Sequence, residues 1–182
     1  MKPYIRAVAA QYAIKYALKY NPEWPSDVGL GGDCTNFVSQ ALYAGGWTMV
    51  QHNIYAGGRD FRSWYSGKAG SGVNDRSRTW AAAANFDLFL NSGGRAKPCK
   101  QEELWLGDVV QLMWTDTGDI HHTMIVTGFQ RAGNKRIPLL AYHTVDTLQK
   151  PITEMPKNDT LNCWHINDWF EENVSYILPR AG

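Results

Sequence analysis

The stretch that most constrains the fold spans residues 31–40 and reads Gly-Gly-Asp-Cys-Thr-Asn-Phe-Val-Ser-Gln. Its two glycines allow a sharp turn and stop any preceding element. Asp33 is then the expected N-cap, with its carboxylate accepting from the free amides of a first helical turn. Apolar residues follow at the spacing of a core-facing helix, at Phe37, Val38, Ala41 and Leu42. The pattern therefore predicts a helix that begins at Cys34, presents Cys34 on its inward face, and ends at Gly45-Gly46.

A cysteine at the start of a helix has unusual chemistry. A free thiol has a pKa of about 8.5, so only a few per cent is thiolate at neutral pH. The partial positive charge of a helix N-terminus stabilises the thiolate, and the same free amides can hold an oxyanion. We therefore expect the pKa of Cys34 to be lowered if Cys34 is a nucleophile. The alternative is an inert core cysteine, and the distinction depends on whether the chain supplies a base.

Two other helices are expected. Residues 4–20 are rich in Ala, and Asn21-Pro22 ends the helical pattern. The apolar side of this helix is expected to comprise Ile5, Val8, Tyr12 and Tyr16. Residues 57–77 are rich in Gly, Ser, Arg and Asp and predict a long irregular loop. Thr79 is the expected N-cap of a helix over residues 80–90.

The hydrophobic period changes to that of strands in the second half of the chain. Apolar runs predict strands over residues 109–114, 122–127, 139–145 and 174–178. Helices followed by strands indicate an α+β fold, with N-terminal helices packed on an antiparallel sheet. A chain of 182 residues is expected to form one domain, over residues 1–182.

Two histidines on these strands are the candidates for the base. A hairpin centred on Ala132-Gly133 places His122 directly across from His143, and one centred on Gly133-Asn134 makes them diagonal neighbours. Either register puts both rings on one face of the sheet, opposite the helix that begins with Cys34. A β-bulge would break this arrangement and turn His121 inward instead. A thiol and two imidazoles together supply a nucleophile, a base and an orienting group.

Other interpretations of the same residues stay open. Each histidine alone is more often structural or simply exposed, and Asp146 is either an acceptor behind the site or an ordinary surface carboxylate. Cys34, His143 and one of His121 and His122 could instead bind zinc. Against zinc, the chain has no Cys-x-x-Cys spacing, and adjacent residues of a strand point to opposite faces. We therefore expect neither a metal nor another cofactor.

Composition limits the partners. The net charge of +1 argues against nucleic acid and against an anionic membrane surface, and no run of 18 apolar residues could span a membrane. The first twenty residues do not read as a signal peptide, since they contain Lys15 and Lys19 and have no small-residue cleavage site. Cys99 and Cys163 could form a disulfide, but sequence cannot show their proximity. The compartment therefore stays open, with the cell envelope or secretion as options, and we expect a monomer.

Four segments carry a resemblance to a known family. They are Gly32–Gln40, the strand start Gly-Asp-Val-Val-Gln at 107–111, His-Thr-Met-Ile-Val-Thr at 122–127 and Tyr-His-Thr-Val-Asp at 142–146. Together they resemble the bacterial putative amidase domain family, which is similar to papain-like cysteine amidases and peptidases of the bacterial cell wall, such as CHAP domains. The resemblance covers nearly the whole chain.

The resemblance implies a papain-like fold with Cys34 as nucleophile, His122 as base and His143 as the residue that orients the base. It implies a hydrolase that cleaves amide bonds in peptides or peptidoglycan through a thioester. Two alternatives stand beside it. One is a non-catalytic module that binds peptide or glycan in a cleft lined by aromatic side chains. The other is a toxin-like cysteine hydrolase that processes proteins.

Overall fold

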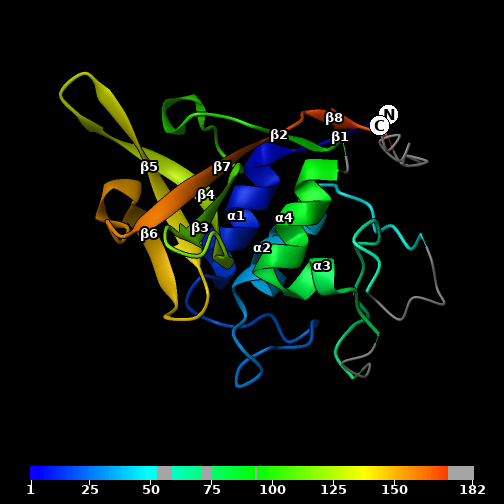
Figure 1. The fold of residues 1–182 in the computed structure, drawn as a ribbon. Helices are drawn as coiled ribbons and strands as arrows, with labels where there is room; N and C mark the ends of the chain where they lie inside the picture. Colours follow the sequence, from blue (N-terminus) through cyan, green and yellow to red (C-terminus); the bar gives the residue numbers. More distant parts are fainter. Residues whose placement is uncertain (53–58, 71–74, 93, 172–182) are drawn as a thin grey trace, which may run out of the picture.

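A layer of helices packs on one face of an antiparallel sheet in the computed structural model, which describes residues 1–52, 59–70, 75–92 and 94–171 (Figure 1). The helices are α1 (Arg6–Tyr16), α2 (Cys34–Ala44), α3 (Arg78–Ala81) and α4 (Ala83–Ser92), with 3-10 turns η2 (Gln101–Glu103) and η3 (Ile152–Glu154). The strands are β1 (Lys2–Pro3), β2 (Ala96–Pro98), β3 (Val109–Trp114), β4 (Ile120–Ala132), β5 (Lys135–Tyr142), β6 (Thr147–Pro151), β7 (Asp159–Ile166) and β8 (Trp169–Phe170). The predicted α+β class is confirmed.

The main sheet has the strand order β2-β7-β3-β4-β5-β6, and each neighbouring pair is antiparallel. A separate two-stranded sheet joins β1 to β8. The strands predicted over residues 109–114, 122–127 and 139–145 correspond to β3, β4 and β5, although β5 ends before His143. The strand predicted over residues 174–178 lies outside the described residues. Strands β2, β6 and β7 were not predicted.

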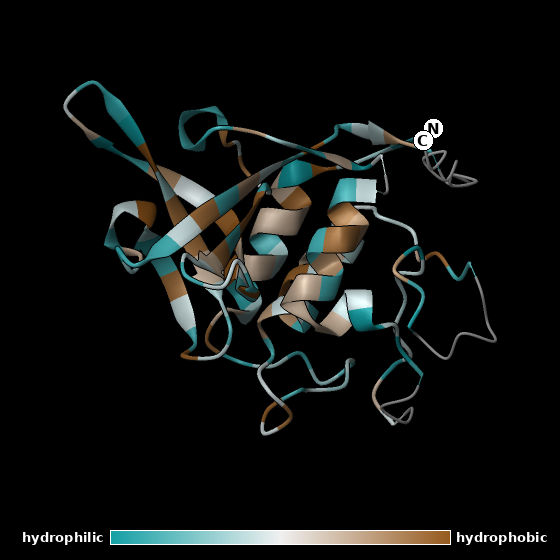
Figure 2. Ribbon diagram, in the orientation of Figure 1, coloured by the Kyte–Doolittle hydropathy of each residue, from teal (hydrophilic) through white to brown (hydrophobic). Residues whose placement is uncertain are grey.

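Both faces of the main sheet are covered. One hydrophobic cluster lies between the helices and the sheet, and its strand residues include Val109, Ile125 and Ala141. The second cluster lies on the opposite face, where Val110 and Met124 of the sheet are buried with a set of residues from the connecting segments, namely Leu104, Ile152 and Met155. Hydrophobic residues accordingly concentrate on the central helices and strands, whereas the tip of the β4–β5 hairpin is hydrophilic (Figure 2). Neighbouring residues of one strand therefore face different environments.

The central helix is α2, whose predicted inward residues Phe37, Val38, Ala41 and Leu42 are all fully buried. Its polar residues are buried too, because other segments bond to them. Trp80 Nε1 donates to Asn36 Oδ1 at 2.8 Å, and Trp64 Nε1 donates to Ser39 Oγ at 3.1 Å. Apolar packing and these hydrogen bonds together bury α2 from Cys34 to Leu42, which holds its N-terminus in place.

The other two predicted helices differ from expectation. Helix α1 buries a stripe of alanines, Ala9, Ala10 and Ala13, and leaves Ile5 and Val8 exposed, because small side chains allow it to approach α2 closely. The helix predicted over residues 80–90 is divided into α3 and α4 by the extended backbone of Ala82. Thr79 is not its N-cap, since α3 begins one residue earlier and the Thr79 hydroxyl bonds to the Ser63 carbonyl and to Ser77. None of the helices in the described part of the chain has the length and apolarity of a membrane span.

Candidate active site

Cys34 is the first residue of α2 and lines a cavity of about 420 Å³. Its side chain is nearly covered, with the residue 7% exposed. The cavity is walled by small residues, Gly31, Gly32 and Ala81–Ala84, and by four groups that carry or can carry charge, Asp27, Arg76, Arg78 and His121. The predicted helix start and the inward direction of Cys34 are therefore confirmed. Cys34 belongs to the lining of this cavity and to neither of the two hydrophobic clusters.

The environment of the thiol does not match the expected electrostatics. Burial raises the pKa of Cys34, and nearby Asp33 adds to this effect. Hydrogen bonds from the Thr123 backbone and from Thr35 act in the opposite direction and stabilise the thiolate. The balance is a raised pKa, so the prediction of a lowered value is wrong. Loss of hydration on burial is the largest cause of the raised pKa.

Asp33 contacts three segments. Its Oδ1 accepts from the Asp27 amide at 2.7 Å and from Asn36 Nδ2 at 2.8 Å, and its Oδ2 lies 2.7 Å from His143 Nδ1. Asp33 is the N-cap residue of α2, as predicted, but its side chain makes no capping bond to the free amides of the first turn, so that part of the prediction is wrong. Instead, the carboxylate ties the preceding loop and the end of β5 to the start of α2.

His143 lies beneath the start of α2 and not beside His122. Its side chain and that of Asp33 are each 2% exposed. The other ring nitrogen, Nε2, lies 2.8 Å from the Tyr16 carbonyl oxygen, and the ring stacks on Phe37 with 4.2 Å between centroids. Both ring nitrogens thus lie within hydrogen-bond distance of protein oxygen atoms. The orienting role expected from the resemblance stays a prediction, while the contacts of His143 are those of a structural pair with Asp33.

Bulges change the register of β4 on both sides. The β4–β5 hairpin pairs Ala132 with Lys135, so its turn is Gly133-Asn134, one of the two predicted registers. A shift between Val126 and Gly128 then pairs Ile125 with Ala141. Since side chains alternate, His122 and His143 lie on opposite faces, and the predicted common face is wrong. His122 packs edge-on against Tyr142, 4.8 Å between centroids, on the face turned away from the helices.

His121 is the histidine that lines the cavity with Cys34. A second bulge shifts the β3–β4 pairing, which joins Leu112 to His122 but Met113 to Ile120 and leaves His121 unpaired between them. The His121 ring stacks on Trp114 with centroids 4.5 Å apart. Its Nε2 lies 3.3 Å from Asp159 Oδ2, an ion-pair distance without hydrogen-bond geometry. The alternative stated for a bulged strand, that His121 faces inward, therefore describes the observed cavity.

His122 is held in a poorly solvated environment. Burial, with a smaller contribution from His121, lowers the pKa of His122 to about 4, while Asp159 acts in the opposite direction. The ring is therefore neutral at neutral pH, the form that can accept a proton. Apo geometry does not disqualify a base that moves on substrate binding, so the assignment of the base to His122 stays a prediction.

Stability should depend on pH through His122. Because the folded pKa of about 4 lies below the ordinary 6.5, the unfolded chain binds the proton more tightly between these values. The stabilising contribution is complete above pH 6.5 and is lost as the pH falls towards 4, by up to about 3 kcal/mol. Urea unfolding of wild type and His122→Gln at pH 7 and pH 4 measures this loss in the free energy of unfolding. The contributions of other titrating groups are common to the two proteins and cancel in the difference. Equal losses in the two proteins would contradict the expectation.

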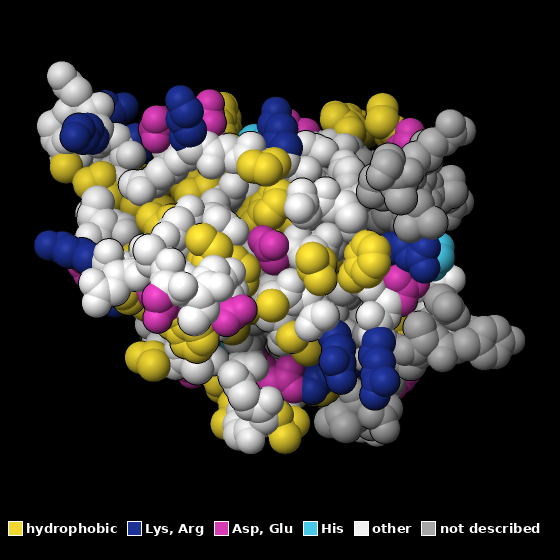
Figure 3. Space-filling view, in the orientation of Figure 1, with side chains coloured by type: hydrophobic (Ala, Val, Ile, Leu, Met, Phe, Trp, Pro, Cys, Tyr) yellow, Lys and Arg dark blue, Asp and Glu magenta, His cyan; other side chains and the backbone are white. Residues whose placement is uncertain are grey.

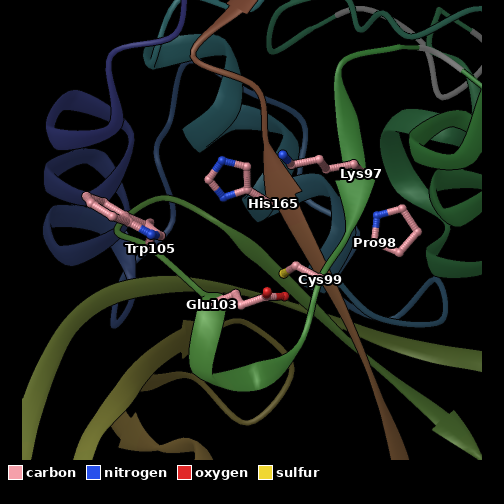
Figure 4. Close-up of a pocket in the computed structure, with 6 residues that line it drawn as sticks. All are labelled: Lys97, Pro98, Cys99, Glu103, Trp105 and His165. Carbon is pink, nitrogen blue, oxygen red and sulfur yellow. The ribbon is translucent and has the colours of Figure 1, made fainter.

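The remaining cysteines, Cys99 and Cys163, are not among the residues that line this cavity. Cys99 donates its amide to the Cys163 carbonyl at 3.0 Å, and both thiols are free. Figure 4 shows Cys99 in a separate cavity with Glu103, Trp105 and His165. Burial raises the pKa of Cys99 to about 11 and that of Cys163 to about 12, so neither is an activated thiol.

No metal centre is evident in the described part of the chain, where no three His, Cys, Asp or Glu side chains are grouped as ligands. Asp146 is an exposed acceptor from the Tyr20 hydroxyl at 3.2 Å. Sequence analysis missed Arg76 and Arg78, which line the cavity, and Asp159, which lies beside the His121 ring. The arginines belong to a region predicted only as loop and its flank, and Asp159 begins a strand that was not predicted.

Comparisons with known proteins confirm the amidase domain family. The sequence model of a family described as "Putative amidase domain" matches residues 3–166. An uncharacterized protein, YhbB of Bacillus subtilis (strain 168), is 33% identical over 148 residues, which cover 79% of this chain and 42% of YhbB. The chain thus spans less than half the length of that relative. No solved structure matches significantly.

Proposed function

Because this chain belongs to the putative amidase domain family, we propose that it hydrolyses amide bonds with Cys34 as the nucleophile. The observation that carries the proposal is the position of Cys34. Its sulfur lies at the N-terminus of a buried helix, in an open cavity that also holds a histidine. An inert core cysteine would have no cavity and no base beside it.

The cavity supports acyl transfer in two steps. The base removes the thiol proton as the substrate binds, because burial raises the pKa of Cys34 and disfavours a resting thiolate. The sulfur attacks the amide carbonyl, and the Cys34 amide in the first turn of α2 donates to the oxyanion. The protonated base gives its proton to the leaving amine. Water, deprotonated by the same base, then hydrolyses the thioester and restores the thiol.

We assign the base to His121. It lines the cavity with Cys34, and its Nε2 faces Asp159, so Nδ1 is the nitrogen left to receive the thiol proton. Trp114 fixes the plane of the ring by stacking on it. Asp159 would hold the ring orientation and stabilise the imidazolium, as the third member of a catalytic triad does. This assignment competes with His122, the base implied by the resemblance.

Single alanine variants separate the two histidines. Loss of a general base lowers the rate by about 10²- to 10⁴-fold, and we expect this loss in kcat for His121→Ala. His122→Ala should retain activity within about tenfold, since its ring packs against Tyr142 on the other face. The opposite result, with activity lost only in His122→Ala, would reassign the base to His122 and leave the cysteine mechanism standing.

We propose a peptide or peptidoglycan-type amide as the substrate, which mass spectrometry can test directly. Purified peptidoglycan fragments are incubated with the protein and with Cys34→Ala, and the products are compared. A new amine terminus produced only by the wild type identifies both the substrate and the bond. A non-catalytic binding module would retain the fragments without changing their mass, and that result would exclude the hydrolase.

A further inference from the structure

The cavity that contains Cys34 has an excess of positive charge. Its lining includes two arginines, Arg76 and Arg78, but one carboxylate, Asp27. Asp27 is paired with Arg76, so the charge of Arg78 is left uncompensated within the lining. Figure 3 shows Lys and Arg side chains gathered beside acidic ones at the lower edge of the face in view, below α3. A ligand that completes this charge balance must be anionic.

Arg76 is held rigidly and is incompletely bonded. Its side chain is 8% exposed, and Nη2 donates to Asp27 Oδ1. The second terminal nitrogen, Nη1, is buried and has no hydrogen-bond partner among the described residues. A buried N–H group without a partner costs free energy that a bound oxygen would recover. The guanidinium therefore has donor capacity left over at the cavity wall.

Arg78 is the more accessible of the two arginines that line the cavity. It is exposed, it lines the cavity, and no described residue forms an ion pair with it. Residues 81–84, which form the nearby wall, are all alanine and offer a ligand no competing polar side chain. A guanidinium presents a planar fork of donors that matches the two oxygens of a carboxylate.

We propose that Arg76 and Arg78 bind a carboxylate of the substrate, so that the enzyme acts on amides with a free carboxylate close to the scissile bond. This inference rests on the proposed function, because it places the carboxylate relative to Cys34. It names an acidic class of substrate, in which the carboxylate is either a chain terminus or an acidic side chain. A neutral amide of the same shape would leave the arginines unpaired and bind less well.

Two alkylating agents test the inference without a known substrate. Iodoacetate and iodoacetamide react alike, since the sulfur bonds to the CH2 carbon and iodide leaves, but only iodoacetate carries a carboxylate. We expect the ratio of the iodoacetate rate to the iodoacetamide rate to be about tenfold higher for wild-type Cys34 than for glutathione. This is the effect of one hydrogen bond between charged groups. The rates are measured by mass spectrometry of the Cys34 peptide. Taking the ratio of the two reagents cancels the pKa of the thiol.

Matched variants assign the preference. Arg78→Gln should remove most of it, while Arg78→Lys, which keeps the charge but not the fork, should retain part. Arg131→Gln is the control, since it removes an equal charge from an exposed position near the β4–β5 turn. Arg76 is left unchanged, because its loss would leave Asp27 buried without a partner.

The outcomes separate this inference from the proposed function. Carboxylate binding would be overturned if the ratio of the iodoacetate rate to the iodoacetamide rate were the same for wild-type Cys34 as for glutathione. Equal losses of the iodoacetate preference in Arg78→Gln and Arg131→Gln would overturn it too. In both cases Cys34 would still be a reactive thiol. If neither reagent labels Cys34 in the folded protein although both label it after unfolding, the cavity does not admit a ligand to the sulfur. That result would overturn both proposals.

Discussion

Replacing Cys34 with Ala is expected to remove amide hydrolysis, with kcat falling by about 10³-fold or more, because no other group in the cavity can form the thioester. The measurement is the time course of new amine termini released from the peptidoglycan fragments that the wild type cleaves. Cys34→Ser tests the chemistry more strictly, since it keeps the size of the side chain. A hydroxyl is a far weaker nucleophile than a thiol, so this variant should be almost as inactive.

Loss of activity must be separated from loss of structure. Cys163→Ala is the matched control, since Cys163 is a buried thiol whose side chain belongs to the second hydrophobic cluster, on the other face of the sheet. It should lower stability modestly and leave activity unchanged. Urea unfolding of all three variants verifies that they fold. Full activity in folded Cys34→Ala would refute the cysteine mechanism.

The helix that carries Cys34 was predictable because its signals are local. The glycines before it, the apolar spacing of Phe37, Val38 and Ala41, and the glycines after it all act within one segment. The hydrophobic runs of β3, β4 and β5 are local in the same sense. From these elements the α+β class and the inward direction of Cys34 followed correctly.

The pairing of the histidines was not predictable, because it depends on bulges. One inserted residue reverses every side chain beyond it. The shift between Val126 and Gly128 separates His122 from His143, and the shift at Met113 leaves His121 unpaired. Each bulge is determined by packing between strands, and no residue pattern within a single strand predicts it. The turn Gly133-Asn134 was predicted correctly, but the prediction that His122 and His143 share one face of the sheet was still wrong.

Electrostatics also escaped prediction. Position at a helix terminus is visible in sequence, but desolvation depends on what covers the thiol, and burial raises the pKa of Cys34. In the same way, an Asp before a helix usually caps it. Here the carboxylate of Asp33 has a partner in His143, just after β5 and far along the chain, and its side chain makes no bond to the amides of the first turn.

The Asp33–His143 pair should contribute more to stability than any other contact of the site. Removing one partner of a buried hydrogen bond to a carboxylate costs about 3 kcal/mol, because the other group is left buried without its partner. We therefore expect His143→Ala and Asp33→Ala each to lower the free energy of unfolding by about that amount. The free energy of unfolding of a small domain is only about 5–15 kcal/mol in total, so either substitution removes a large part of it. Urea unfolding at pH 7 gives the values.

A double-mutant cycle isolates the pair from the other contacts of each residue. Asp33 also bonds to the Asp27 amide and to Asn36, and His143 also bonds to Tyr16 and stacks on Phe37. The free energy lost with those other contacts differs between the two single variants, whereas the free energy lost with the Asp33–His143 contact is counted in both. The double variant should therefore be more stable than the sum of the single effects predicts. His143→Gln, whose amide can still donate to Asp33, is the milder variant if His143→Ala fails to fold.

The same variants decide between two roles for His143. If it supports the start of α2 through Asp33, His143→Gln lowers stability and leaves the pH profile of kcat unchanged in the folded protein. If it orients the base instead, as the resemblance implies, stability changes little while the pH profile and kcat change together. The contacts favour the first result, since both ring nitrogens of His143 are already bonded to Asp33 and the Tyr16 carbonyl. A ring with no free nitrogen cannot hold a second histidine.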